Sequence, residues 1–270
     1  MITLQERIKF ICFILEDVFT RLPEVLEQGR LRRDNLGVPW LNRKSVINII
    51  FDDDPQASVE AMLLALAEGV TEVELASAVS YAAGLRIARF HTSNEFSDWD
   101  TALHTFTFAN AVEQGLRRAP SIELLRGVFD AAMSVYLDRF LNIPAARLPQ
   151  AGEGEIDCDA LLESLPALLD RQQQVNEAGE LVAQYLLGGG DKDQIMATLG
   201  KLLLREDRDF HTIQAIEAAF RQAQLLQDDE RVHVLIAATR YLAAHTPTVR
   251  AQGQTYDIAY RLHRGDRLHI

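Results

Sequence analysis

Cysteine is scarce in this chain of 270 residues, where only Cys12 and Cys158 occur. The two lie far apart, and neither belongs to a CxxC or CxH motif of the kind that holds zinc or an iron–sulfur cluster. The sequence therefore predicts no cysteine-ligated metal centre and no catalytic thiol. Scattered cysteines are typical of a reducing compartment, where each usually packs as a small apolar side chain.

Long apolar runs are also missing. No stretch reaches the roughly 18 apolar residues that a membrane span needs. The first residues mix Glu6, Arg7 and Lys9 with apolar side chains, which is not the pattern of a signal peptide. We therefore expect a cytoplasmic protein without a membrane span.

Basic residues are outnumbered, since 27 Lys and Arg stand against 39 Asp and Glu and give a formal net charge of -12. A surface of this sign repels phosphate backbones and anionic lipid headgroups. This argues against nucleic acid and against a membrane as partners.

Alternating strand patterns are rare, whereas apolar residues recur at helical spacing nearly everywhere, as between Ile8 and Phe19. Two exceptions are short: residues 45–51 fit either a strand or a buried turn of helix, and residues 254–258 fit an extended tail. With 48% hydrophobic residues the chain can bury a large core. The sequence therefore predicts an all-α, multi-helix bundle.

A Gly-, Pro- and acid-rich stretch at residues 148–159 is the best linker candidate, and the regions on its two sides show an internal repeat. At one constant offset Gly69 aligns with Gly189, and Phe90-His91-Thr92 aligns with Phe210-His211-Thr212. After both glycines a helix start follows, with Thr71 and Asp191 as the expected N-caps. We predict a single domain, residues 1–270, with two pseudo-twofold copies at about 57–142 and 177–246.

The alignment changes beyond the shared tripeptide, because the first copy carries an insert at residues 93–99. A second offset places Leu103-His104-Thr105 on residues 210–212 instead. The first copy thus offers two histidines where the second offers one. Each copy is expected to contain about four helices.

The most chemically loaded part of the chain is residues 89–104. If it is helical, His91 and Glu95 share a face at i, i+4, as do Asp100 and His104. The second copy offers Asp207 and His211 at the same spacing, and Glu230 with His233 at i, i+3. Imidazole and carboxylate groups at these spacings hold iron or manganese in helical bundles.

We therefore predict a metal site for iron or another divalent transition metal in a cavity shared by the copies. His91, His104 and His211 would line the cavity, with Glu95, Asp100 and Asp207 orienting them. The competing interpretation is that these are ordinary buried or surface side chains, since histidines next to Phe and Thr often hydrogen-bond across helix interfaces. A di-metal bundle also usually supplies two Glu-x-x-His pairs, and here there is one.

Around the two tripeptides, in residues 91–110 and 205–217, the chain resembles the helical region of some bacterial Rieske-domain proteins and, more distantly, questin oxidase-type proteins. The resemblance runs from about Leu31 to the C-terminus. It implies an oxidoreductase context in which the helical body supplies a substrate pocket or a docking surface. The CxH and CxxH pairs that hold the Rieske cluster are absent, so the resemblance carries no [2Fe-2S] centre to this chain.

The leading functional hypothesis is thus an oxidoreductase-like protein with a histidine-lined, metal-binding pocket, without an assigned reaction. The alternative is a non-catalytic helical interaction module that docks a redox protein or another protein partner. Apolar runs at residues 128–136 and 232–244 favour a homodimer through the last helix of each copy.

Overall fold

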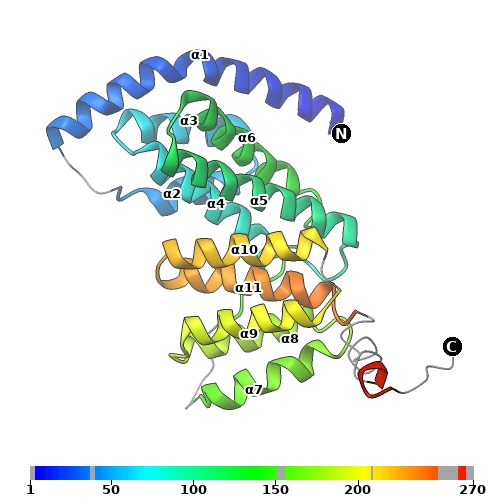
Figure 1. Cartoon of the computed structure of the whole chain (residues 1–270). Helices are drawn as coiled ribbons and strands as arrows, with labels where there is room; N and C mark the ends of the chain where they lie inside the picture. The colour runs from blue at the N-terminus through cyan, green and yellow to red at the C-terminus, as the bar shows by residue number, and fades with distance from the viewer. Residues whose placement is uncertain (1–3, 37–39, 151–155, 208, 249–260, 266–270) are drawn as a thin grey trace. The chain divides into compact units, whose positions relative to one another are not determined.

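The chain is helical, and the computed structural model describes residues 4–36, 40–150, 156–207, 209–248 and 261–265. Within these ranges no β-strand occurs, so the predicted all-α class is confirmed. The helices are α1 (Leu4–Leu36), α2 (Arg43–Ile50), α3 (Pro55–Ala67), α4 (Glu72–Ala88), α5 (Phe96–Arg118), α6 (Ile122–Asp138), α7 (Cys158–Leu169), α8 (Val175–Leu187), α9 (Lys192–Arg205), α10 (Phe210–Leu225) and α11 (Asp228–Ala244) (Figure 1).

The helices form two compact units. Unit 1 contains Met1–Arg86 and Thr101–Ile143, and unit 2 contains Ile87–Asp100 and Pro144–Ile270. The two expected copies fall one in each unit, except that the connection between α4 and α5 belongs to unit 2.

In unit 1 the long helix α1 runs along α3 and α6 (Figure 1). The approach to α3 is close because α1 carries Gly29 at the crossing, where a Cβ would collide with the carbonyl oxygen of Leu66. The contact buries Val18, Leu22 and Leu66, each at most 1% exposed. Burial of side chains of this size contributes roughly 1.5–3 kcal/mol each, so the α1–α3 contact is a main source of stability in this unit.

Residues 45–51, which fit either a strand or a helix by sequence, lie mostly in helix α2. The acidic turn that follows is a helix start. Asp54 accepts hydrogen bonds from the backbone nitrogens of Gln56 and Ala57, and Pro55 occupies the first helical position. Proline has no N–H to lose there, so both residues favour α3 beginning at this point.

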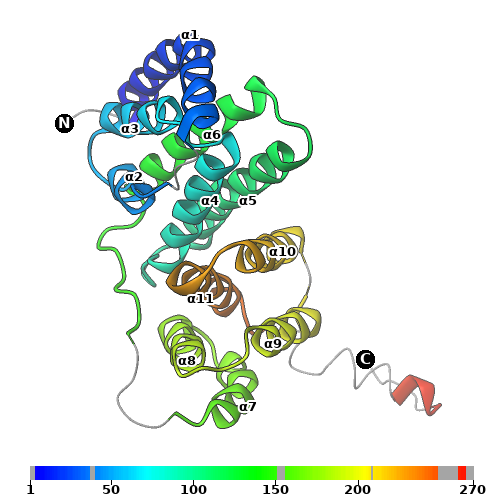
Figure 2. The same ribbon diagram turned by 90° about the vertical axis from the view of Figure 1, so that its left-hand side faces the viewer.

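In unit 2 helix α11 is the central element, in contact with α8, α9 and α10 (Figure 2). It is apolar around nearly its whole circumference, and every residue from Val234 to Ala243 is buried. A helix that is apolar on all sides needs neighbours on all sides. The run that suggested a dimer interface, residues 232–244, is thus largely covered within the single chain.

The connection between α4 and α5 is attached to unit 2 through Arg240 of α11. The guanidinium donates to the carbonyl oxygen of Phe90 at 2.5 Å and to Oδ1 of Asn176 at 2.8 Å. Phe90 also meets Trp99 edge to face, with 5.0 Å between ring centroids. The α4–α5 connection is therefore bound to α8 and α11 by buried polar and aromatic contacts.

The two glycine turns that suggested a duplication have the same local geometry. Gly69 and Gly189 adopt φ values of 104° and 89°, which favour glycine because a Cβ would be strained there. In each turn the next residue's nitrogen donates five positions back, from Val70 to Ala65 and from Gly190 to Tyr185. Both turns thus end one helix and start the next in the same way.

The helix starts after these turns also match the sequence prediction. Thr71 and Glu74 form a reciprocal capping box, and Asp191 accepts from the backbone nitrogens of Asp193 and Gln194. The aligned tripeptides, in contrast, lie in different surroundings: Phe90 is fully buried in a turn, whereas Phe210 opens α10 and is 62% exposed. The internal duplication stays a prediction.

The predicted linker at residues 148–159 falls partly outside the described residues. Its end starts helix α7, where Asp157 accepts from the backbone nitrogen of Ala160. The predicted extended tail at residues 254–258 also lies outside them. Among the helices described above, none is long and apolar enough to cross a membrane.

Candidate functional site

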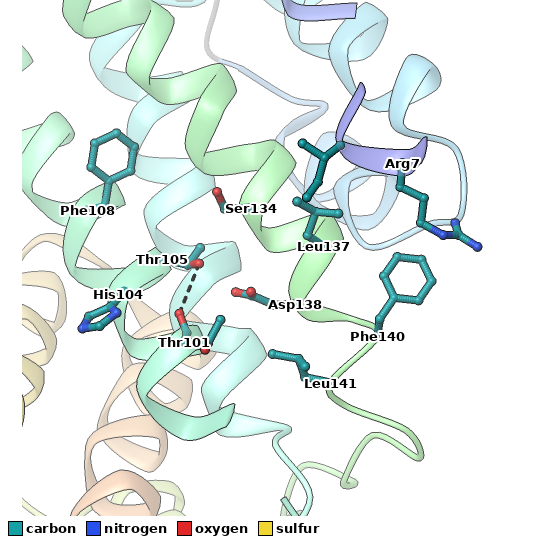
Figure 3. Close-up of a pocket in the computed structure, with 11 residues that line it drawn as sticks. Arg7, Thr101, His104, Thr105, Phe108, Ser134, Leu137, Asp138, Phe140 and Leu141 are labelled. Carbon is teal, nitrogen blue, oxygen red and sulfur yellow. Dashed lines mark hydrogen bonds between the residues drawn. The ribbon is translucent and has the colours of Figure 1, made fainter. Parts of the chain in front are cut away.

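A cavity of about 790 Å³ opens in unit 1 between α1, α5 and α6 (Figure 3). Its lining is largely apolar, with a few polar groups from the three helices and the turn after α6. The lining side chains are Arg7, Ile8, Thr101, His104, Thr105, Phe108, Ser134, Leu137, Asp138, Phe140 and Leu141. A concave, mainly apolar site of this size with a few polar groups is typical of small-molecule binding.

The most unusual lining residue is Asp138, at the end of α6. Its side chain is 4% exposed, and Oδ2 is buried without a hydrogen-bond partner. The hydroxyl of Thr105 on α5, which donates to the carbonyl oxygen of Thr101 at 3.5 Å, also lies beside the carboxyl group and lowers its pKa. Buried polar atoms are nearly always paired in folded proteins, because an unpaired one costs about 1–3 kcal/mol. Oδ2 therefore marks a place where an additional donor would stabilise the protein.

Burial raises the pKa of Asp138 from 3.8 to about 6. Two effects oppose it: the Thr105 hydrogen bond and the positive charge of Arg86 both favour the ionised form and lower the pKa. The burial effect wins because an ionised carboxylate loses its hydration in an apolar surrounding. Carboxyl groups shifted toward neutrality in a cavity are candidates for a functional role.

Arg86 of α4 is held by its own contacts. It is 6% exposed, its Nη2 donates to the carbonyl oxygen of Val135 at 3.0 Å, and its Cζ lies 4.5 Å from the ring centroid of Phe51. A buried guanidinium fixed in this way supplies a constant positive charge to its surroundings. Arg86 therefore favours the ionised form of Asp138 without lining the cavity itself.

Arg7 of α1 forms the basic part of the cavity lining. Its Nη1 lies 3.4 Å from the hydroxyl of Tyr136, and its Cζ lies 4.3 Å from the ring centroid of Phe140. Arg139 contacts the same two aromatic rings, at 5.0 Å and 4.8 Å. Stacking on aromatic rings restrains both guanidinium groups at this end of the cavity.

His104 is the one predicted metal ligand that lines this cavity. It is exposed and extends from α5. In Figure 3 its ring lies on the other side of Thr101 and Thr105 from the carboxyl group of Asp138. The two titratable groups therefore contribute to different parts of the lining.

His91 and Glu95 do not share a helix face, because residues 89–95 form the turn between α4 and α5 and helix α5 begins at Phe96. The prediction of i, i+4 pairing between them is therefore wrong. The ring of His91 instead closes a local turn: its Nδ1 accepts from the backbone nitrogen of Ser93 at 3.1 Å and lies 2.7 Å from the Ser93 hydroxyl. Glu95 lines a separate cavity of about 610 Å³ in unit 2.

Asp100 belongs to a cluster with α11 in unit 2. The hydroxyl of Tyr241 donates to its Oδ1 at 2.7 Å, and Nε2 of His245 lies 3.7 Å from the same oxygen. The His245 ring stacks on that of Tyr241, with 4.3 Å between centroids. Burial and the Asp100 bond both raise the pKa of Tyr241 well above its usual range. Sequence reasoning named Asp100 but missed both of these partners.

Asp207 and His211 also lie on no common helix, since α9 ends at Arg205 and α10 begins at Phe210. The expected i, i+4 pairing across this break is therefore wrong. The backbone nitrogen of Asp207 donates to the hydroxyl of Thr248 at 2.8 Å. The ring of His211 lies against that of Phe210, with 3.8 Å between centroids.

Within the part of the chain that the structure describes, no three His, Cys, Asp or Glu side chains are grouped so that they could hold a metal ion. His104 belongs to unit 1, whereas His91 and His211 belong to unit 2. The metal site shared by the copies therefore stays a prediction.

The residues that sequence reasoning missed are Asp138 and Arg86. Arg86 is the single charged residue of the segment AAGLRIA, and Asp138 follows the uncharged residues SVYL and precedes Arg139. Such residues are rarely buried unless they are paired, so this pattern is a usable sequence signal. A charged residue at an apolar helix position predicts either a buried partner or a cavity.

Comparisons with protein-family models, curated proteins and solved structures found no match to this chain. The resemblance to Rieske-domain and questin oxidase-type proteins is therefore left as an expectation from sequence.

Proposed function

We propose that unit 1 binds a small, mainly apolar molecule in the cavity between α1, α5 and α6, with one polar group of the ligand bonded to Asp138. The observation that carries the proposal is the buried Oδ2 of Asp138, which has no partner and belongs to a side chain of the cavity lining.

Two energetic terms support binding there. A donor on the ligand would remove much of the roughly 1–3 kcal/mol cost of the unpaired oxygen. The apolar lining, which includes Phe108 and Leu137, would gain about 25 cal/mol for each Å² of apolar surface removed from water. Both terms favour binding and offset part of the entropic cost of association.

Nile red provides a direct test, because this neutral apolar dye has no hydrogen-bond donor and fluoresces when it leaves water. Ser134 lines the cavity, so Ser134→Phe should fill it and reduce dye affinity about tenfold or more. Ser164→Phe on α7 is the matched control, since Ser164 is exposed and lies in unit 2. Equal dye binding by both variants would refute a ligand site in this cavity.

An oxidoreductase-like function with iron or another divalent metal at His91, His104 and His211 is a second proposal. It is supported by the repeated tripeptide in the sequence and by the place of His104 in the cavity lining. The test is metal analysis of protein purified without chelator, for the wild type and for His211→Ala. Near-zero metal in the wild type would favour the metal-free pocket or the interaction module.

The homodimer and the redox or other protein partner also stay proposals. The apolar run at residues 128–136 is largely buried in the single chain, as is that at 232–244. These runs therefore no longer favour a dimer, although the acidic net charge still fits a basic docking partner. Light scattering at micromolar concentration distinguishes one chain from two.

A further inference from the structure

The charges around Asp138 restrict the kind of ligand that fits the cavity. The other ionisable lining groups are Arg7 from α1 and His104 from α5, both basic. Arg86 acts on the carboxyl group from α4. Arg139 follows Asp138 in the chain, and its guanidinium is paired with the Asp53 carboxylate. Arg86 is the charged group that acts on the Asp138 carboxylate, whereas Arg7 and His104 belong to other parts of the same lining.

A ligand amine bonded to Asp138 would gain the charge of the carboxylate but would also be repelled by Arg86, whose positive charge acts on the same group. A ligand carboxylate would bring an acceptor to Oδ2, which is itself an acceptor when ionised. A neutral hydroxyl avoids both conflicts, because it donates one hydrogen bond and carries no charge. Of these three headgroups the hydroxyl is the one that the surroundings of Oδ2 favour.

We propose that the cavity is selective for neutral, hydroxyl-bearing apolar molecules, with the hydroxyl donating to Oδ2 of Asp138 and the hydrocarbon body lying against Phe108, Leu137 and Leu141. This inference rests on the proposed function, because it names the ligand class of the same cavity. Figure 3 shows the carboxyl group of Asp138 beside Thr105, with Leu141 on its other side. The accepting carboxyl group and the apolar contacts are therefore offered by neighbouring parts of one cavity.

The selectivity follows the ionisation of Asp138. Above its pKa of about 6 the carboxylate accepts a charge-assisted hydrogen bond from the hydroxyl, and this bond is stronger than one between neutral groups. Below this pKa the protonated carboxyl group becomes a donor itself and serves an ether oxygen as well as a hydroxyl. The preference for a hydroxyl is thus present at pH 8 and lost at about pH 5.

The experiment is displacement of Nile red from the full chain by four ligands with one naphthalene body: a naphthylmethanol, its methyl ether, the corresponding methylamine and the carboxylate. At pH 8 we expect the alcohol to bind about tenfold more tightly than the ether, and more tightly than the amine or the carboxylate. At pH 5 the difference between alcohol and ether should fall to about twofold or less.

Three variants assign the effect. Asp138→Asn keeps the side-chain shape and should abolish the pH dependence of the alcohol preference. Asp130→Asn is the matched control, because Asp130 lies on the same helix, is half-buried, has a pKa raised by burial and does not line the cavity. Histidine also titrates in this range, so His104→Asn should leave the pH dependence in place.

The outcomes separate this inference from the proposed function. If Nile red binds in the cavity but the alcohol and ether bind equally at pH 8, or the amine binds best, the hydroxyl selectivity is wrong and the ligand site stands. If Nile red does not bind, or binds equally to Ser134→Phe, both are wrong. If Asp138→Asn does not fold, the pH dependence of the alcohol preference in the wild type and in His104→Asn decides whether the hydroxyl selectivity is right.

Discussion

The substitution Gly179→Ala in α8 directly tests how tightly α8 packs against Arg240 in unit 2. A Cβ at this position would lie 3.0 Å from Cγ and 3.2 Å from Cδ of Arg240. Arg240 has little freedom to move aside, because it is 2% exposed and its guanidinium bonds Asn176 and Phe90. The new methyl group is therefore forced against a fixed side chain.

The expected magnitude follows from two opposing terms. Replacing a glycine inside a helix by alanine gains about 1 kcal/mol. Overpacking a well-filled core costs about 1–3 kcal/mol. We therefore expect Gly179→Ala to lower the free energy of unfolding by about 0–2 kcal/mol. In an Arg240→Ala background the collision is gone, and the same substitution should stabilise by up to about 1 kcal/mol.

Gly200→Ala on α9 is the matched control, because its Cβ would meet only the Phe220 ring, at 3.8 Å. It should stabilise by about 1 kcal/mol. Urea unfolding followed by the fluorescence of Trp99, in a Trp40→Phe background, reports on unit 2 since Trp99 is 2% exposed there. Equal stabilisation by Gly179→Ala and Gly200→Ala would refute the close contact with Arg240.

Three further substitutions test other buried groups. Because burial raises the pKa of Asp138 to about 6, the folded state binds the proton more tightly than the unfolded chain does. The contribution of Asp138 to stability is therefore present below the unfolded pKa of about 4 and is lost as the pH rises through about 6, by about 3 kcal/mol at most. Urea unfolding of Asp138→Asn should lack this pH-dependent loss. Tyr241→Phe removes the bond to Asp100 and should lower the free energy of unfolding of unit 2 by about 1–3 kcal/mol, as read from Trp99 fluorescence. Gly29→Ala places a methyl group against the carbonyl of Leu66 and should destabilise unit 1 by more than about 2 kcal/mol in thermal unfolding followed by circular dichroism, whereas a change under about 0.5 kcal/mol would contradict the close α1–α3 approach.

Local interactions explain why the helices could be predicted from the sequence. The capping box of Thr71 and Glu74 involves residues three positions apart, and Asp191 caps α9 through backbone groups next to it. Such signals are complete within one short segment and need no knowledge of the tertiary fold. Residues 45–51 were ambiguous because a short apolar run fits a strand as well as a buried turn of helix.

The candidate site was harder to predict because the i, i+4 argument assumes an unbroken helix. That assumption fails between His91 and Glu95, where the chain turns, and between Asp207 and His211, where α9 and α10 meet. Asp138 acquires its properties from Thr105 and Arg86, which belong to other helices. A charged residue among apolar ones indicates that a partner or a cavity is present, but which helices supply the partners depends on packing.

A comparison of two buried charged groups shows what structure adds. Arg240 is the one charged residue of the segment VLIAATRYLAA, whereas Asp138 in SVYLDRF follows a largely apolar run and is itself followed by Arg139. Arg240 bonds protein atoms through both of its terminal nitrogens and thereby holds the α4–α5 connection onto α8 and α11. Asp138 leaves one oxygen without a partner while lining a cavity. Arg240 also leaves its buried Nε without a partner, so the feature that distinguishes Asp138 is its place in a cavity lining. This place is why we propose Asp138, and not Arg240, as the ligand-binding group.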